Sequence, residues 1–263
     1  MAPHAFAVIN QKGGTGKTTT AVSLAHAWSA KGLRVLLVDA DPQGHVARLL
    51  GLSAPQGHTT AELLTGDRTL SEVTIEARPG LLVVPSDRTL ARAEVVVSSE
   101  ADGLFRLADH AEAMRGLADV IVVDCPPQLG TLSLSGLVLV SDLISQGSKG
   151  GMVVPVELET LSIMGLVDLL QTAGRLEKRG MAPPLHALVP TRVDRRRSLS
   201  RDVAEQLEER FPGRVTEPIG ASVRFPESVE AGQTLLEYEP EHAGALAYAR
   251  IAGTITHQDY GKE

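Results

Sequence analysis

The sequence predicts an α/β fold, in which a doubly wound, mostly parallel sheet is flanked by helices on both faces. Three observations predict it. Short apolar runs rich in valine, isoleucine and leucine recur along the chain, longer segments between them have apolar residues three and four positions apart, and glycines or carboxylates follow several runs. Strands buried on both faces have such continuous apolar runs, and crossover helices connect them. Ligands of these sheets bind beyond the carboxyl ends of the strands.

Six of the apolar runs are predicted to be strands, at residues 6–9, 35–38, 81–84, 120–123, 152–156 and 185–189. Three of the intervening segments are predicted to be helices, at residues 18–30, 161–176 and 203–211. Gly32 and Gly180 follow two of these helices, at positions where a left-handed C-cap is useful. Residues 147–151, GSKGG, form the one flexible-looking stretch, and no repeat or long linker divides the chain.

Composition and charge limit the classes of protein that this chain can belong to. With 43% hydrophobic residues, the 263 residues suffice for one sizeable core, so we expect a single domain over residues 1–263 without an N-terminal helix-turn-helix domain. The net charge of -7 means that affinity for DNA or a membrane requires a local patch. The single cysteine, Cys125, excludes an intrachain disulfide, and neither a signal peptide nor a membrane-spanning run is recognisable. We therefore expect a cytoplasmic protein.

Residues 12–19, KGGTGKTT, lie directly after the first predicted strand and open the first predicted helix, which is the context of a phosphate-binding loop. Glycines there let the backbone approach phosphates, so that successive N–H groups and the helix N-terminus face the anion. Lys17 is placed to reach the β and γ oxygens, and the Thr18 hydroxyl to ligate Mg²⁺. The predicted nucleotide-binding residues are Gly13, Gly14, Thr15, Gly16, Lys17, Thr18 and Thr19.

The loop departs from the pattern G-x-x-x-x-G-K-[ST], because the first glycine of that pattern falls on Gln11 and a lysine, Lys12, stands inside the loop. A glycine-rich turn without a ligand is the alternative interpretation. It is disfavoured by the flanking strand and helix and by acidic residues that follow two other predicted strands.

Those acidic residues are Asp39 and Asp41 after the second predicted strand and Asp124 after the fourth. Asp124 has the position from which an aspartate holds Mg²⁺, usually through water. Asp39 and Asp41 stand at the switch point of the sheet, where a nucleophilic water can be oriented beside a γ-phosphate. Asp41 followed by Pro42 could instead merely start a turn. We favour the functional interpretation because the three segments converge on the same edge of one sheet.

At these residues the sequence resembles the ParA/Soj/MinD group of deviant Walker A ATPases, and the resemblance spans most of the chain. It is strongest in NQKGGTGKTTTAVSLA at residues 10–25, VLLVDADPQG at 35–44 and VIVVDCPPQLG at 120–130. The resemblance implies a P-loop NTPase fold, ATP and Mg²⁺ as cofactors, and a homodimer that closes around ATP. It also implies slow basal ATP hydrolysis that a partner protein stimulates.

The resemblance also assigns roles by position. Lys12 corresponds to the signature lysine that reaches across the dimer to the partner's phosphates, whereas Lys17 contacts the phosphates of its own protomer. Asp41 corresponds to the aspartate that positions the hydrolytic water. The residues assigned to Mg²⁺ are Thr18, Asp124 and, in a supporting role, Asp39.

Two later segments also match the family in outline. The segment 153–166, VVPVELETLSIMGL, resembles a family strand and its following helix, although residues 138–151 make the preceding junction longer than usual. Residues 218–230 correspond to a loop near the adenine, which makes Pro218 a predicted nucleotide contact.

The family contains several classes, and the sequence separates them unevenly. A MinD-type protein ends in a basic amphipathic helix that lies on the membrane, but the tail from His242 offers only Arg250 and Lys262 opposite an apolar face. We expect that helix to pack on the core, without membrane binding. Nitrogenase-iron-protein or arsenical-pump relatives need more cysteines than Cys125, which we interpret as a small buried residue.

A ParA-type protein requires a basic surface for nonspecific DNA. Residues 191–201, TRVDRRRSLSR, contain five arginines against one aspartate, and arginine-rich loops bind phosphate oxygens without reading bases. The alternative is a solvated loop that precedes the next helix. The predicted DNA-binding residues are Arg192, Arg195, Arg196, Arg197, Arg201 and Arg224.

The expected function is therefore that of a nucleoid-associated ParA-like ATPase. It would partition or position a plasmid, a chromosome origin or a protein assembly, with a ParB-like or cargo-adapter protein as its activating partner. The alternatives are a MinD-like positioning ATPase and an ATP-dependent metabolic enzyme of the amidoligase type, which shares the loop motif.

Overall fold

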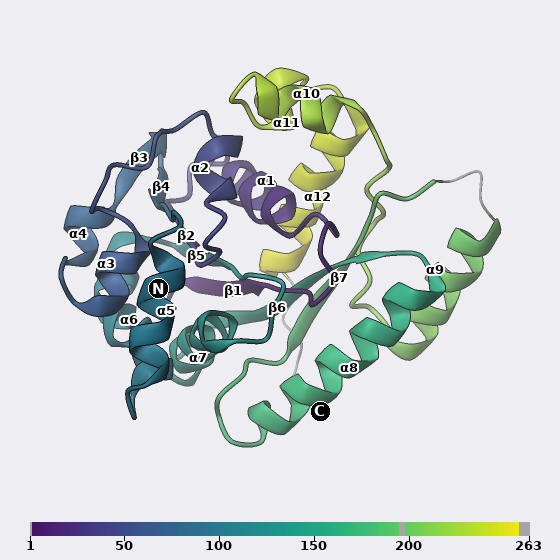
Figure 1. Cartoon of the computed structure of the whole chain (residues 1–263). Coiled ribbons are helices and arrows are strands. Elements are labelled where there is room, and N and C mark those ends of the chain that lie inside the picture. The colour runs from purple at the N-terminus through teal and green to yellow at the C-terminus, as the bar shows by residue number, and fades with distance from the viewer. Residues whose placement is uncertain (1, 195–197, 258–263) are drawn as a thin grey trace.

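A computed structural model describes residues 2–194 and 198–257 of the chain (Figure 1). Its strands form one seven-stranded sheet in the order β3-β4-β2-β5-β1-β6-β7, and only β3 runs antiparallel to its neighbour. The predicted doubly wound, mostly parallel α/β fold is confirmed. The strands are β1 (His4–Val8), β2 (Val35–Asp39), β3 (Ile75–Arg78), β4 (Leu81–Val84), β5 (Val120–Asp124), β6 (Lys149–Glu157) and β7 (Leu185–Thr191).

All six predicted strands are present, and β3 is the strand that the apolar pattern missed. Its sequence, IEAR, is half polar and only partly buried, because it lies at the edge of the sheet and pairs with β4 alone. An edge strand needs no continuous apolar run, since one of its sides remains open to solvent.

Helices cover both faces of the sheet (Figure 1). One face is packed against α1 and α12, and the other against α5, α7 and α8, which gives two separate apolar cores. The helices described are α1 (Lys17–Ser29), α2 (His45–Leu49), α3 (Thr60–Thr65), α4 (Leu70–Val73), α5 (Leu90–Ser98), α6 (Ala111–Leu117), α7 (Thr131–Ser145), α8 (Thr160–Glu177), α9 (Ser198–Arg210), α10 (Arg224–Glu230), α11 (Leu235–Tyr238) and α12 (Ala243–His257). The three predicted helices correspond to α1, α8 and α9.

Helix α12 packs on α1, as expected for the C-terminal segment. Ile251 and Ile255 are buried, and the Trp28 indole of α1 donates a hydrogen bond to the Ala252 carbonyl at 2.9 Å. The same indole stacks on Phe6 of β1, with ring centroids 5.2 Å apart. Among the residues that the model describes, no helix is both long and apolar enough to cross a membrane.

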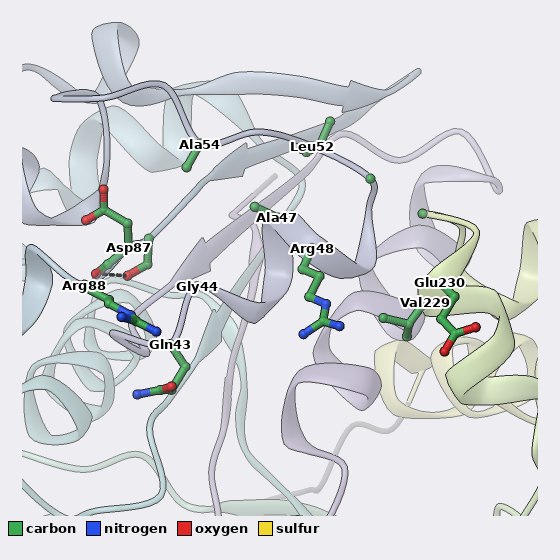
Figure 2. A pocket seen from close by; sticks show the side chains of 13 residues that line it. Gln43, Gly44, Ala47, Arg48, Leu52, Ala54, Asp87, Arg88, Val229 and Glu230 are labelled. Carbon is green, nitrogen blue, oxygen red and sulfur yellow. Dashed lines mark hydrogen bonds between the residues drawn. The ribbon is translucent and has the colours of Figure 1, made fainter.

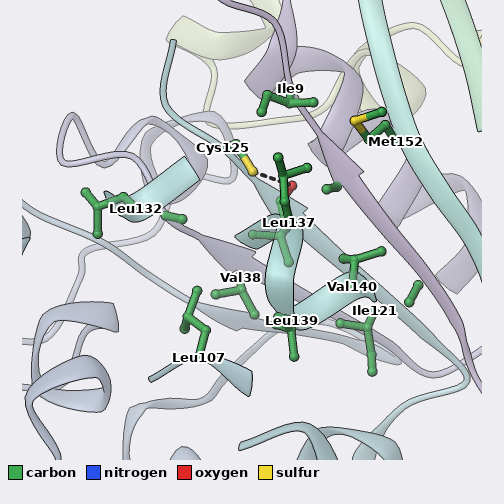
Figure 3. Packing of buried hydrophobic residues seen from close by; sticks show 14 of the residues in the cluster. Ile9, Val38, Leu107, Ile121, Cys125, Leu132, Leu137, Leu139, Val140 and Met152 are labelled. Atoms are coloured by element: carbon green, nitrogen blue, oxygen red, sulfur yellow. Dashed lines mark hydrogen bonds between the residues drawn. The ribbon is translucent and has the colours of Figure 1, made fainter. Parts of the chain in front are cut away.

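Helix α7 supplies the first part of the junction at residues 138–151, and β6 supplies its end. The helix is apolar almost all round, and side chains such as Leu137 and Leu139 pack against Val38 and Ile121 of the sheet (Figure 3). A helix buried in this way lacks the alternation of faces that identifies a surface helix. Cys125 is buried beside α7, which confirms its interpretation as a small buried residue, and burial raises the pKa of its thiol.

The expectation of a flexible stretch at residues 147–151 is wrong for its second half. Residues 149–151 belong to β6 and pair with β1, Gly150 opposite Ala5 and Gly151 opposite Phe6. A Cβ atom on Gly150 would lie 2.0 Å from the Ala5 carbonyl oxygen, so only glycine permits this approach of the strands. These glycines are therefore required by the packing of the sheet.

The strand register brings the predicted functional segments together. Val8 at the end of β1 is the register partner of Asp124 at the end of β5, and Asp124 is also the partner of Asp39 at the end of β2. The loop after β1 thus lies at the same edge of the sheet as the two carboxyl groups. This convergence, expected from the sequence, is confirmed.

Candidate nucleotide-binding site

The glycine-rich loop leads directly into α1, which begins at Lys17. Gly14 and Gly16 have φ angles of 78° and 85°, in the left-handed region that favours glycine. No described side chain caps the helix N-terminus. Its first N–H groups are therefore free to bind an anion, which the positive end of the helix dipole also attracts.

The side chains of Asn10 and Thr191 hold this loop in place. The Asn10 side chain donates to the Pro155 carbonyl at 2.6 Å and accepts from the Lys12 N–H at 3.0 Å, which joins the loop to β6. The Thr191 hydroxyl donates to the Thr15 carbonyl at 2.8 Å, which joins it to β7. Protein groups alone thus shape the loop, and such preorganisation reduces the entropic cost of binding.

Lys17 is buried, and its ammonium group donates to the Lys12 carbonyl at 3.1 Å. Burial lowers the pKa of Lys17, whereas the nearby Asp124 and Asp41 carboxylates raise it. A buried cation at a helix N-terminus is suited to bind phosphate oxygens, because their charge replaces the hydration that the ammonium has lost.

The Lys12 side chain extends toward the end of β6. Its ammonium group lies 2.6 Å from Glu157 Oε2 and 3.5 Å from Glu159 Oε2. Lys12 remains partly exposed, at 38% of its side-chain surface. It is therefore accessible from outside the protomer, as its predicted role across a dimer requires.

Asp39 and Asp41 shape one loop but differ in what their carboxylates contact. Asp39 is fully buried, and its two oxygens accept hydrogen bonds from the Asp41 N–H at 3.0 Å and the Val46 N–H at 3.2 Å. Asp41 Oδ1 accepts from the Gln43 N–H at 2.9 Å. Asp39 thus fixes the position of Asp41. The assignment of Asp39 to Mg²⁺ stays a prediction, and this geometry favours a supporting role.

Asp124 fits a cation site. Both of its carboxylate oxygens are buried, and neither has a hydrogen-bond partner of ordinary geometry among the described residues. Burial raises the pKa of Asp124, an effect opposed by the neighbouring Thr18 hydroxyl and Lys17 ammonium. A buried acceptor without partners, beside a threonine hydroxyl, offers the oxygen ligands that Mg²⁺ prefers.

Lys17, Thr18 and Asp41 line a cavity of about 590 Å³. Besides the loop and Asp41, its wall includes Glu94 of α5, Gln128 after β5 and Arg192 after β7. The Ser133 hydroxyl donates to the Pro126 and Gln128 carbonyls at 3.0 and 2.6 Å, which holds the segment after β5 to α7. Sequence reasoning had not assigned Glu94 or Gln128 to the site, and no motif marks them.

A second cavity of about 590 Å³ adjoins the loop at Gly16 and Thr19. It is largely apolar, with Phe225 and Tyr248 in its wall, and is a candidate site for the base of a nucleotide. Pro218, the predicted contact, is not part of this wall, which begins one residue later at Ile219.

A third cavity of about 640 Å³ lies on the far side of the Asp41 loop, between α2, residues 86–88 and the end of α10 (Figure 2). Gln43 lines both this cavity and the phosphate cavity. A Cβ atom on Gly44 would lie 2.6 Å from the Ser86 carbonyl oxygen, so glycine allows this loop to lie close to its neighbour. The two cavities therefore share one tightly packed loop.

The structure describes contacts for only some of the predicted DNA-binding arginines. Arg192 has a left-handed backbone, with φ of 53°, and forms an ion pair with Glu157 at 3.5 Å. Arg224 forms ion pairs with Glu227 and Glu239. Arg201 belongs to α9, and Arg195, Arg196 and Arg197 lie outside the described residues.

A parallel sheet with a glycine-rich loop after β1 and aspartates ending β2 and β5 defines the chain as a P-loop nucleotide-binding protein. A family model described as "AAA domain" matches residues 4–186. The chain is 34% identical to chromosome partitioning protein ParA of Caulobacter vibrioides, covering 98% of this chain and 96% of that protein. It is 32% identical to sporulation initiation inhibitor protein Soj of Bacillus subtilis, covering 95% and 97% respectively. The chain belongs to the ParA/Soj/MinD family of P-loop ATPases.

Solved structures with bound nucleotide share the fold of this chain. Cobyrinic acid a,c-diamide synthase from Mycobacterium smegmatis, with bound ATP analogue and magnesium, is 31% identical, with a TM-score of 0.78 over 95% of this chain and 93% of that one. A variant of McdA from Cyanothece, in complex with ATP, has a TM-score of 0.84 at 21% identity, over 99% of both chains, which shows a shared fold.

Proposed function

We propose that this chain is an ATP hydrolase that forms a homodimer on binding ATP and Mg²⁺, and that uses the dimer to partition or position a cargo on DNA. The observation that supports the proposal best is the arrangement at the phosphate cavity. An uncapped helix N-terminus and buried Lys17 line it together with Thr18, and the buried Asp124 carboxylate lies next to Thr18. Lys12 of the same loop is partly exposed.

Each residue then has a chemical task. The loop N–H groups and the Lys17 ammonium bind phosphate oxygens and stabilise the negative charge that develops during phosphoryl transfer. Thr18 and Asp124 would hold Mg²⁺, which neutralises phosphate charge when bound. Asp41 orients the attacking water, because Asp39 fixes its backbone and Gln43 holds only its Oδ1.

The base would occupy the apolar cavity beside Gly16. Phe225 and Pro226 supply the flat apolar surfaces that stack on a purine, and the backbone from Ile219 to Val223 supplies polar groups for its edge. Pro218 would then act by directing this segment of backbone.

The DNA and cargo parts of the proposal rest on other grounds. Relatives named as chromosome partitioning proteins support a role on DNA. We assign the main DNA contacts to Arg195, Arg196 and Arg197, because these three residues are the most concentrated positive charge in the sequence. A ParB-like or adapter protein would stimulate hydrolysis and supply the cargo.

The test is an ATPase assay on the purified chain with and without nonspecific duplex DNA, combined with light scattering in ATP, ADP and a slowly hydrolysed ATP analogue. We expect a slow basal rate, a dimer with ATP or the analogue but not with ADP, and DNA binding only by the dimer. A monomer in all nucleotides would refute the proposal.

A second candidate is an ATP-dependent metabolic enzyme, because the chain is 31% identical to a protein described as a diamide synthase. Such an enzyme would hydrolyse ATP in proportion to a small carboxylate substrate and an amide donor, and DNA would not affect it. The same assay, with a carboxylate library in place of DNA, separates the two. A MinD-like role on a membrane is less favoured, because α12 packs its apolar side against α1.

A further inference from the structure

The ammonium group of Lys12 is bound by carboxylates of its own chain. Its distance of 2.6 Å from Glu157 Oε2 is that of a charge-assisted hydrogen bond, and Glu159 lies 3.5 Å away. To bind a phosphate in a partner protomer, Lys12 must leave this position, because a carboxylate held beside a γ-phosphate would repel it. Dimer formation is therefore an exchange of one anion for another.

Glu157 is well suited to hold Lys12. It ends β6 and is only 15% exposed, so its ion pair is partly shielded from water. Its second oxygen, Oε1, lies 3.5 Å from the guanidinium group of Arg192. When Lys12 leaves, Arg192 still compensates the Glu157 charge, which keeps the exchange reversible rather than leaving a largely buried carboxylate unpaired.

Protonation does not govern this exchange. The pKa of Lys12 is raised, chiefly by its hydrogen bond to Glu157, so the side chain is cationic throughout the physiological range. The competition is between two anions for one permanent cation. Only an anion with several charged oxygens close to the partner's surface can replace Glu157 as the contact of Lys12.

We propose that Glu157 restrains Lys12 in the nucleotide-free monomer, and that the γ-phosphate bound by the partner protomer displaces it when the dimer forms. This inference rests on the ATP-dependent dimer of the proposed function. Glu157 is then a positioning residue that acts through Lys12. It sets how much ATP is needed for dimerisation and makes the terminal phosphate the feature that is recognised.

The variant that tests the restraint is Glu157→Gln, which keeps the shape and a hydrogen-bond acceptor but removes the charge. Loss of a partly exposed ion pair changes an equilibrium by roughly threefold to tenfold. Because a symmetric dimer releases two copies of Lys12, we expect its dissociation constant with a slowly hydrolysed ATP analogue to fall by roughly tenfold to a hundredfold. Sedimentation over a protein concentration series measures this constant.

Glu177→Gln is the matched control, since Glu177 is an exposed residue at the end of α8 and has the same charge. It should leave the dissociation constant unchanged. In the double variant with Lys12→Gln, the gain from Glu157→Gln should disappear. An unchanged or weaker dimer in Glu157→Gln would overturn the inference, because Glu157 would then be neutral or would support the dimer.

The restraint of Lys12 by Glu157 can also be measured without a dimer. In the nucleotide-free monomer, acylation of Lys12 by an amine-reactive ester, followed by mass spectrometry, reports how firmly its ammonium is held. We expect Glu157→Gln to accelerate modification of Lys12 severalfold, with no change at Lys178. Equal rates would refute the restraint. A wild-type chain that fails to dimerise would count against the proposed function alone.

Discussion

Asp39 and Asp124 are register partners at the carboxyl ends of the adjacent strands β2 and β5, and both carboxyl groups are buried. Burial raises the pKa of each, and the charge of Asp124 raises that of Asp39 further. Two buried carboxyl groups with raised pKa values destabilise the protein at neutral pH, where they tend to ionise, and a cation bound beside them would relieve the repulsion. The first prediction follows from this pair.

Asp124→Asn should make the ligand-free protein less sensitive to pH. The folded pKa of Asp124 is raised to about 7, above the unfolded value of about 3.9, so between these values the folded chain holds a proton that the unfolded chain lacks. The free energy of unfolding therefore falls as pH rises through this window, by up to about 1.4 kcal/mol per pH unit for one such group. Urea denaturation at pH 5, 6, 7 and 8 should show a flatter profile in the variant. An unchanged profile would mean that the pKa of Asp124 is not raised in the folded protein.

Asp41→Asn should slow hydrolysis by roughly a hundredfold, because it removes the charge that orients the attacking water. The amide oxygen can still accept the hydrogen bond from the Gln43 N–H, so the loop should keep its shape. ATP binding and dimerisation are expected to remain near wild type. Single-turnover mixing with ATP measures the chemical step, and a wild-type rate would remove Asp41 from its role.

Lys17→Ala should weaken ATP and ADP binding alike, by roughly tenfold to a hundredfold, because it removes a buried cation that contacts phosphate in the ground state and in the transition state. Titration with a fluorescent nucleotide measures this affinity. Lys178→Ala, which removes the same charge from an exposed position, is the control. Equal affinities in the two variants would show that Lys17 does not face the phosphates.

The arrangement of loop, helix and strand ends at the candidate phosphate site could be predicted from the sequence because its information is local. The order of strand, glycine loop, Lys17 and helix is contiguous, and carboxylates that end parallel strands must meet at one edge. The contacts of Lys12 with Glu157 and of Asn10 with Pro155 join residues 145 positions apart, and nothing in either segment shows the pairing. Residues 149–151 were misinterpreted for a related reason. Glycine in a strand resembles glycine in a loop until the neighbouring strand is known.

This last distinction can be tested with two glycines of the same segment. Gly147 and Gly150 both have left-handed backbones, with φ of 97° and 133°, but a Cβ atom would meet nothing within 4 Å at Gly147 and the Ala5 carbonyl oxygen at Gly150. Gly147→Ala should therefore destabilise the protein by about 1–2 kcal/mol through backbone strain alone. Gly150→Ala should cost about 3 kcal/mol or more, because β1 and β6 must also separate. Similar losses in urea denaturation would mean that residues 149–151 do not pair with β1 in solution.

The last prediction concerns DNA, because a chain with a net charge of -7 must bind the duplex through a local patch. If Arg195, Arg196 and Arg197 of both protomers contact phosphates, six counterions are released, and the logarithm of affinity should fall against the logarithm of salt with a slope of roughly -5. Replacing all three with alanine should flatten this slope and release the ATP-bound dimer from DNA, without a change in dimerisation or basal hydrolysis. Arg224→Ala should have little effect, because Glu227 and Glu239 already neutralise that side chain.

Filter binding across a salt series measures this slope for the wild-type chain and for the triple variant. If the triple variant kept its slope, the arginine-rich segment would be only a solvated loop, and Arg175 and Arg179, near the end of α8, would be the next residues to test.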